Sequence, residues 1–190
     1  MQLLKKYKHI FGRDLADVGI IPGAECTIPL ITDAKPFVQD LYAMSDQHKD
    51  EIKRQCKLLL DANLIRVSHG SPFCSSPTLA KKADGTWRLA IDYRRLNYIS
   101  VTNTRPTPNI TNSIKALAGK EYYTIADCRS GYFHVQIKES DKWKTAFTDG
   151  STLYEWNVMP FGFKNASGLW QSIMNETYDK CPNTVVHYDD

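Results

Sequence analysis

Two strand-like segments of this sequence end in aspartate, and together they restrict the folds that the chain can adopt. Residues 122–126 (YYTIA) lead into Asp127, and residues 184–188 (TVVHY) lead into Asp189 and Asp190. Short carboxylates at the ends of two rigid strands can hold two divalent ions about 3.5–4 Å apart, because they supply hard, bridging oxygen ligands. Each signal alone is weak, since a single Asp after a strand is more often a turn residue and a final Asp pair is more often solvated.

The hydrophobic pattern predicts helices and strands that segregate along the chain instead of alternating strictly, which is typical of the α+β class. Residues 1–44 are predicted to be irregular, because prolines interrupt any regular period. A helix over 45–63 begins at Ser45, and Gly119 ends a short helix over 111–118. Pro182 limits a third helix over 165–179. The predicted strands are 78–82, 86–93, 122–126, 133–137, 144–148, 153–158 and 184–187.

The pair of strands 78–82 and 86–93 is predicted to form a β-hairpin, because Asp84-Gly85 between them is a strong turn signal. In the second strand apolar and charged residues alternate, so Arg88 points away from the core. Five basic residues, Lys81, Lys82, Arg88, Arg94 and Arg95, fall within 81–95. They form either a solvated hairpin face or a phosphate-facing surface.

Length and composition narrow the class of protein. A chain of 190 residues is long enough for a substantial core in one or two domains. No apolar run approaches the roughly 18 residues of a membrane span, and no signal peptide is evident, so we expect no membrane association. The cysteines are odd in number and scattered, which favours reduced thiols in an intracellular protein over a zinc site or a disulfide framework. They are Cys26, Cys56, Cys74, Cys128 and Cys181.

Five segments in order carry a resemblance to a known family. They are 84–88 (DGTWR), 91–97 (IDYRRLN), 123–137 (YTIADCRSGYFHVQI), 144–147 (KTAF) and 154–166 (YEWNVMPFGFKNA). From about residue 25 onward, the chain resembles the reverse transcriptase in the Pol polyprotein of gypsy-type LTR retrotransposons and of retroviruses. One departure stands out, because His187-Tyr188 occupies the first two positions of the family's Tyr-x-Asp-Asp box.

The resemblance implies a right-hand polymerase fold, in which an antiparallel palm sheet packs on helices. Residues 1–100 and 137–160 would form the N-terminal segment and fingers, and residues 101–136 and 161–190 the palm. The thumb and the RNase H segment of the parent polyprotein would lie outside this fragment. The isolated fragment is therefore expected to be inactive or nearly so.

The resemblance also implies a set of site residues and partners. Asp127, Asp189 and Asp190 would be catalytic and would bind two Mg²⁺ ions, with Mn²⁺ as an alternative and the Cys128 carbonyl as a further ligand. Partners would be dNTPs and an RNA or DNA template with its primer, in the cytoplasm or within virus-like particles. The implied nucleotide-binding residues are Lys82 (Lys81 less so), Arg88, Tyr132, Phe161 and Gly162, and the implied template or primer contacts are Arg94, Asn97, Gln171 and Tyr188. For Gln171, a contact with template and a place in a polar network both remain open.

Two other functions stay open on the sequence. The chain could be a non-catalytic, nucleic-acid-binding relic of a retroelement polymerase, which His187 favours and the three aspartates oppose. It could also be an RNA-directed RNA polymerase, which Tyr132 and the run from Trp87 to Asn97 oppose.

Overall fold

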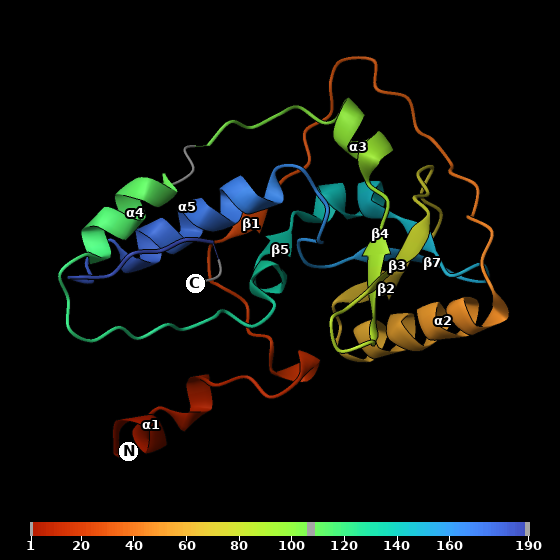
Figure 1. Ribbon diagram of the computed structural model, residues 1–190. Coiled ribbons are helices and arrows are strands. Elements are labelled where there is room, and N and C mark those ends of the chain that lie inside the picture. Colours follow the sequence, from red (N-terminus) through yellow and green to blue (C-terminus); the bar gives the residue numbers. More distant parts are fainter. Residues whose placement is uncertain (1, 106–108, 189–190) are drawn as a thin grey trace.

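The protein is an α+β structure, described by a computed structural model over residues 2–105 and 109–188 (Figure 1). The helices are α1 (Gln2–Lys6), α2 (Asp46–Asp61), α3 (Arg94–Ile99), α4 (Ile110–Leu117) and α5 (Ala166–Tyr178). The 3-10 helices are η1 (Lys8–Ile10), η2 (Leu15–Asp17), η3 (Gly131–His134) and η4 (Glu139–Thr145). The strands are β1 (Glu25–Cys26), β2 (Ile65–Val67), β3 (Pro77–Lys81), β4 (Trp87–Ile91), β5 (Gln136–Ile137), β6 (Phe147–Thr148) and β7 (Leu153–Trp156).

The strands form three small sheets rather than one large one. β2, β7 and β6 form an antiparallel sheet in that order, and β3 pairs with β4 as an antiparallel hairpin. β1 pairs with β5 in parallel, which joins the N-terminal segment to the middle of the chain. In Figure 1, α2 and the hairpin lie at one end of the molecule, while α4 and α5 lie at the other. Within the described residues, no helix combines the length and apolar character needed to cross a membrane.

A single core connects these sheets. Tyr93, at the start of α3, is fully buried, and its hydroxyl donates to the Thr145 carbonyl oxygen at 2.8 Å. The Thr145 hydroxyl oxygen in turn accepts a hydrogen bond of 2.9 Å from the Trp156 backbone N–H in β7. Because an unpaired polar group in a core is costly, these bonds tie the hairpin region, η4 and the three-stranded sheet together in one arrangement.

The elements with strong local signals form as predicted. Ser45 begins α2, and its side-chain oxygen accepts from the His48 backbone N–H. In the hairpin turn, the Asp84 carboxylate accepts from both the backbone and the hydroxyl of Thr86, at 2.9 and 2.6 Å. Gly85 has φ of 83°, a left-handed conformation that a glycine adopts at little cost. Arg88 is exposed while Ile91 is buried, as the alternation predicts.

The two strands expected to carry the aspartates do not form. Residues 122–126 and 184–187 have no regular secondary structure, and within the described part of the chain neither segment pairs with another strand. Tyr122 and Ile125 are 85% and 82% exposed. A strand-like sequence becomes a strand only where a neighbouring chain satisfies its backbone N–H and C=O groups. The prediction of strands at these positions is therefore wrong for this structure.

Further predictions need correction. The strand expected over 133–137 starts with η3, because Ser130 (φ of 53°) turns the chain, and only β5 remains extended. The strand expected over 144–148 is shorter than predicted, because η4 extends to Thr145 and only β6 is a strand. Helix α3 was missed: the Asp92 carboxylate accepts from the Arg94 backbone N–H at 3.1 Å, which ends the strand and starts the helix. Residues 1–44 also contain short elements, among them α1 and β1.

Candidate active site

One cavity of about 510 Å³ gathers residues from distant parts of the sequence. Most of its walls come from α2, from the β3–β4 hairpin and from the turn that follows Asp127, and Leu15, Trp156 and Phe161 complete them. Lys82 and Arg88 contribute cationic side chains, and Asp127 contributes a carboxylate. Lys81 does not line this cavity. Five residues expected from the sequence to form a site thus meet here: Lys82, Arg88, Asp127, Cys128 and Phe161.

Asp127 is exposed at the entrance to a tight turn. The Cys128 carbonyl oxygen accepts from the Gly131 backbone N–H at 3.2 Å, and the Ser130 carbonyl oxygen accepts from the Phe133 N–H at 2.8 Å. These bonds fix the chain directly after Asp127. The Cys128 carbonyl oxygen is thus held in one orientation within the turn.

Aromatic rings pack behind this turn. The ring centroids of Tyr132 and Phe161 are 5.2 Å apart, and those of Tyr132 and Trp170 are 6.3 Å apart. The Arg88 guanidinium carbon lies 5.8 Å from the Phe161 ring centroid, within the range of a cation–π contact. Phe161 therefore connects the half-buried Tyr132 ring with the cationic hairpin.

The loop that carries Phe161 is held by Asn97. The Asn97 amide donates to the Gly162 carbonyl oxygen at 2.8 Å, and its side-chain oxygen accepts from the Lys164 backbone N–H at 2.9 Å. Gly162 has φ of 86°, and a Cβ atom there would lie 3.5 Å from the Ile91 carbonyl oxygen. An L-residue at position 162 would be strained by this left-handed backbone. Asn97 thus fixes the position of the Phe161–Gly162 loop.

Gln171 and Trp170 hold the chain just before the final aspartates. Gln171 is fully buried, and its side-chain oxygen accepts from the Tyr188 backbone N–H at 2.7 Å. Its amide nitrogen donates to the Asn175 side-chain oxygen at 2.8 Å and to the Val186 carbonyl oxygen at 3.3 Å. The Trp170 indole N–H donates to the Tyr188 carbonyl oxygen at 3.1 Å. The sequence left open whether Gln171 contacts template or belongs to a polar network. The structure shows that its side chain belongs to a polar network.

Arg94 lies outside the cavity, at the exposed first position of α3. It is bonded to the Asp92 carboxylate at 2.7 and 2.8 Å, and the Tyr42 hydroxyl donates to the same carboxylate at 2.5 Å. The hydrogen bond from Arg94 holds the pKa of the Asp92 carboxyl well below its usual range, despite partial burial. The pair keeps the Arg94 guanidinium, which is 83% exposed, in one orientation at the surface.

Several residues that line the cavity were not identified from the sequence. Arg54 is bonded to both Glu51 carboxylate oxygens at 2.7 Å, which lowers the pKa of the Glu51 carboxyl to about 2. Gln55 donates to the Trp87 carbonyl oxygen at 2.9 Å and accepts from the Leu89 backbone N–H at 2.8 Å. These bonds fix α2 against β4. The hydrophobic period of α2 does not show that Arg54 and Gln55 line a cavity. Their position becomes evident only from the way α2 packs against β4.

Only part of the expected set of metal ligands lies within the described residues. Asp189 and Asp190 lie outside the described residues, so Asp127 is the one carboxylate of the expected three whose position is known. Among the described residues, no group of three or more His, Cys, Asp or Glu side chains is arranged to hold a metal ion. The exposed Asp127 carboxylate and the Cys128 carbonyl, both on the cavity wall, have the hard oxygen chemistry that Mg²⁺ requires.

Sequence comparison assigns the family. Residues 80–190 match the family described as reverse transcriptase (RNA-dependent DNA polymerase), and this match covers more than half of the chain. The chain belongs to the reverse transcriptase family. The retrovirus-related Pol polyprotein from transposon 297 of Drosophila melanogaster is 34% identical over 84% of this chain and 16% of that protein. The polyprotein from Drosophila transposon opus is 30% identical over 92% of this chain and 18% of that protein.

A viral polyprotein matches the chain with a similar sequence identity. The enzymatic polyprotein of cauliflower mosaic virus (strain D/H) is 32% identical over 70% of this chain and 20% of that protein. The chain thus spans about a fifth of the length of these curated relatives. Together they confirm the resemblance to the polymerase of retroelement Pol polyproteins.

Solved reverse transcriptases confirm the fold class. The foamy viral protease–reverse transcriptase in complex with dsDNA aligns with 99% of this chain and 39% of that chain, with a TM-score of 0.87 and 24% identity. The same enzyme in complex with an RNA/DNA hybrid aligns with 99% of this chain and 25% of that chain, at a TM-score of 0.79 and 22% identity. The fold is therefore that of a reverse transcriptase fragment.

Proposed function

We propose that this chain is the fingers and palm part of an RNA-directed DNA polymerase, which adds dNTPs to the 3′-hydroxyl of a primer on an RNA or DNA template. The observation that carries the proposal is the cavity shared by Asp127, Lys82 and Arg88. A triphosphate needs cationic partners, and the ions that accompany it need carboxylates, so one cavity with both kinds of group suits nucleotide transfer.

Lys82 and Arg88 would bind the triphosphate. Both extend from the hairpin into the cavity, and Arg can bind phosphate oxygens bidentately through its planar guanidinium. The contact between Arg88 and Phe161 limits the directions in which the guanidinium points. Phe161 and Gly162 would lie against the base and sugar, in a loop that Asn97 holds in place.

Asp127 would hold two Mg²⁺ ions together with Asp189, Asp190 and the Cys128 carbonyl. When bound, two such ions lower the pKa of the primer hydroxyl and offset the charge of the pyrophosphate leaving group. The turn after Asp127 and the Gln171 bonds to Tyr188 would restrict the two aspartate-bearing segments before nucleotide arrives. Arg94 and Tyr188 would contact template or primer, while Asn97 and Gln171 would act as positioning residues.

Tyr132 would select the sugar of the incoming nucleotide. Its ring packs on that of Phe161, which lines the cavity, and from there it would exclude a 2′-hydroxyl. We expect Tyr132→Val to raise the use of ribonucleotides relative to deoxyribonucleotides, while some DNA synthesis remains. The measurement is the ratio of kcat/KM for a matched dNTP and rNTP in primer extension, by a polymerase that contains this segment together with the regions that follow it in the relatives.

Tyr132→Phe is the matched control, because it keeps the ring and removes only the hydroxyl. It should leave the ratio close to that of the wild type. A ratio that Tyr132→Val does not change would assign Tyr132 to packing alone.

Primer extension also separates the proposed function from a non-catalytic role. His187, where the family has Tyr, favours a nucleic-acid-binding relic. In that case the completed polymerase would bind primer–template and extend nothing with any nucleotide. Incorporation of dNTPs but not rNTPs on an RNA template would support the reverse transcriptase, and the opposite preference would support an RNA polymerase.

A further inference from the structure

The first thirteen residues form a basic segment without any acidic residue. Lys5, Lys6, Lys8 and Arg13 carry positive charge, and the first acidic residue is Asp14. All four basic side chains belong to exposed residues. Like charges so close together repel one another, and binding to an anionic partner would offset this repulsion.

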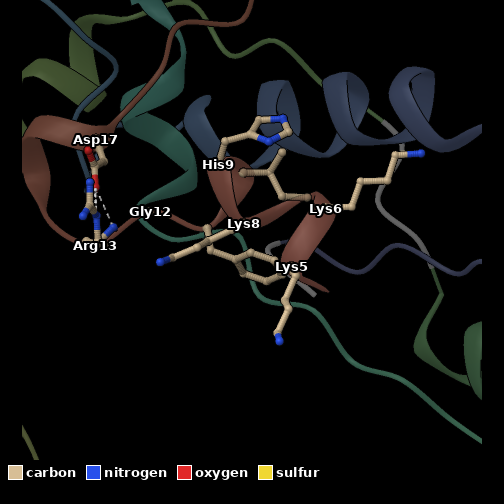
Figure 2. A pocket seen from close by; sticks show the side chains of 9 residues that line it. Lys5, Lys6, Lys8, His9, Gly12, Arg13 and Asp17 are labelled. Carbon is tan, nitrogen blue, oxygen red and sulfur yellow. Dashed lines mark hydrogen bonds and ion pairs between the residues drawn. The ribbon is translucent and has the colours of Figure 1, made fainter. Parts of the chain in front are cut away.

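The basic side chains surround a hollow of about 590 Å³ (Figure 2). Figure 2 shows Lys5 and Lys8 pointing to the same side of the segment, on which Arg13 also lies, whereas Lys6 points the other way. Arg13 pairs with Asp17 at 3.4 Å. Within the described residues, Lys5 and Lys8 form no ion pair, so their charges remain available to a partner.

This segment is attached to the turn that carries Asp127. The Arg129 guanidinium donates to the Gly12 carbonyl oxygen at 3.2 Å. A second cavity of about 440 Å³ is lined by Phe11 from the segment, by Asp127 and by Trp170. The basic segment therefore lies beside the candidate active site, where a nucleic-acid strand would pass.

Aromatic rings alternate with the charges. Tyr7 is 41% exposed and Phe11 is 55% exposed, and the Lys6 ammonium lies 5.2 Å from the Tyr7 ring centroid. Exposed rings among cations are typical of surfaces that bind single strands, because bases stack on the rings while the cations contact phosphates. An anionic membrane fits less well, because α1 has only five residues.

We propose that residues 5–13 bind the phosphodiester backbone of single-stranded nucleic acid next to the Asp127 turn. Lys5 and Lys8 contact phosphates and Tyr7 stacks on a base. This inference rests on the proposed function, since it assumes that a template or primer strand reaches Asp127. It adds a binding surface from the N-terminal segment, which lies before residues 80–190, the part of the chain that the family model matches.

The test is the salt dependence of binding of the 190-residue chain to fluorescein-labelled oligo(dT), measured by fluorescence anisotropy. Each phosphate contact on a single strand contributes about 0.7 to the slope of log K against log salt. Lys5→Gln/Lys8→Gln should therefore make the slope shallower by about 1.4. The control is Lys53→Gln/Lys57→Gln, which removes the same charge from exposed positions on α2 and should leave the slope unchanged.

Further arms separate the competing outcomes. Tyr7→Ser should weaken binding to oligo(dT) without changing affinity for a blunt DNA duplex. Equal slopes for the Lys5/Lys8 variant and the wild type, or an equal loss in the control, would overturn the inference while leaving the polymerase assignment intact. If the Lys5→Gln/Lys8→Gln variant no longer bound phosphatidylserine vesicles but bound oligo(dT) as the wild type does, the inference would also be overturned. The segment would then be assigned to membrane binding. A wild-type chain that binds no nucleic acid at all would count against the proposed function itself.

Discussion

Asp127→Asn is expected to slow nucleotide transfer by about 10²–10⁴-fold, which corresponds to about 3–5 kcal/mol of transition-state stabilisation. Asn is nearly isosteric with Asp but carries no charge, so it cannot balance divalent ions at the cavity wall. The measurement is the single-turnover rate of primer extension as a function of Mg²⁺ concentration, in a polymerase that contains this segment and the regions that follow it in the relatives.

Folding should survive this substitution, because Asp127 is exposed. The control is Asp50→Asn, at an exposed position on α2 outside the cavity, which should leave the rate unchanged. A near-normal rate for Asp127→Asn at every Mg²⁺ concentration would remove Asp127 from the reaction. The rest of the cavity would then need another explanation.

Trp170→Ala should cost about 3–5 kcal/mol of unfolding free energy, since it removes a large ring from a packed core. Trp170 is 2% exposed, and its ring lies 6.3 Å from that of Tyr132 and 6.4 Å from that of His134. For a domain of this size, the loss corresponds to a fall in Tm of roughly 6–20 °C. Urea unfolding of the 190-residue chain, followed by far-UV circular dichroism, measures it.

Two variants locate the origin of the Trp170 effect. Trp170→Phe keeps most of the ring but removes the N–H that donates to the Tyr188 carbonyl oxygen, and it should cost less than Trp170→Ala. Tyr98→Ala, at a side chain that is 85% exposed, should change stability by less than about 0.5 kcal/mol. A loss below about 1 kcal/mol for Trp170→Ala would mean that α5 does not pack on the Tyr132 turn as described.

The side chains of Asn97 and Gln171 form hydrogen bonds within the fold. Asn97 and Gln171 belong to the set expected to contact template or primer, yet their amides are bonded to the Gly162 loop and to the Tyr188 backbone. Asn97 holds the loop that carries Phe161 and Gly162, and Gln171 holds the segment that ends at Tyr188. Substituting them would change the site through its geometry, so effects on activity there do not by themselves identify a contact with nucleic acid.

The elements that have local signals, and the family, could be predicted from the amino-acid sequence. Ser45 marks the start of α2, Asp84-Gly85 marks the hairpin turn, and the apolar period of α5 appears within its own residues. Caps, turns and periods act over a few residues, so they can be read without knowing the rest of the fold. The order of the five motif segments likewise determined the reverse transcriptase assignment.

Which side chains lie close together depends on how distant segments of the chain pack. Strand formation at 122–126 depends on a neighbouring strand, and within the described residues none pairs with it, so the segment before Asp127 is not a strand. The partner of Gln171 lies 17 positions away, and the Arg129 contact with Gly12 spans 117 positions. Such contacts depend on how distant segments pack, and no local pattern in the sequence encodes a partner at that separation.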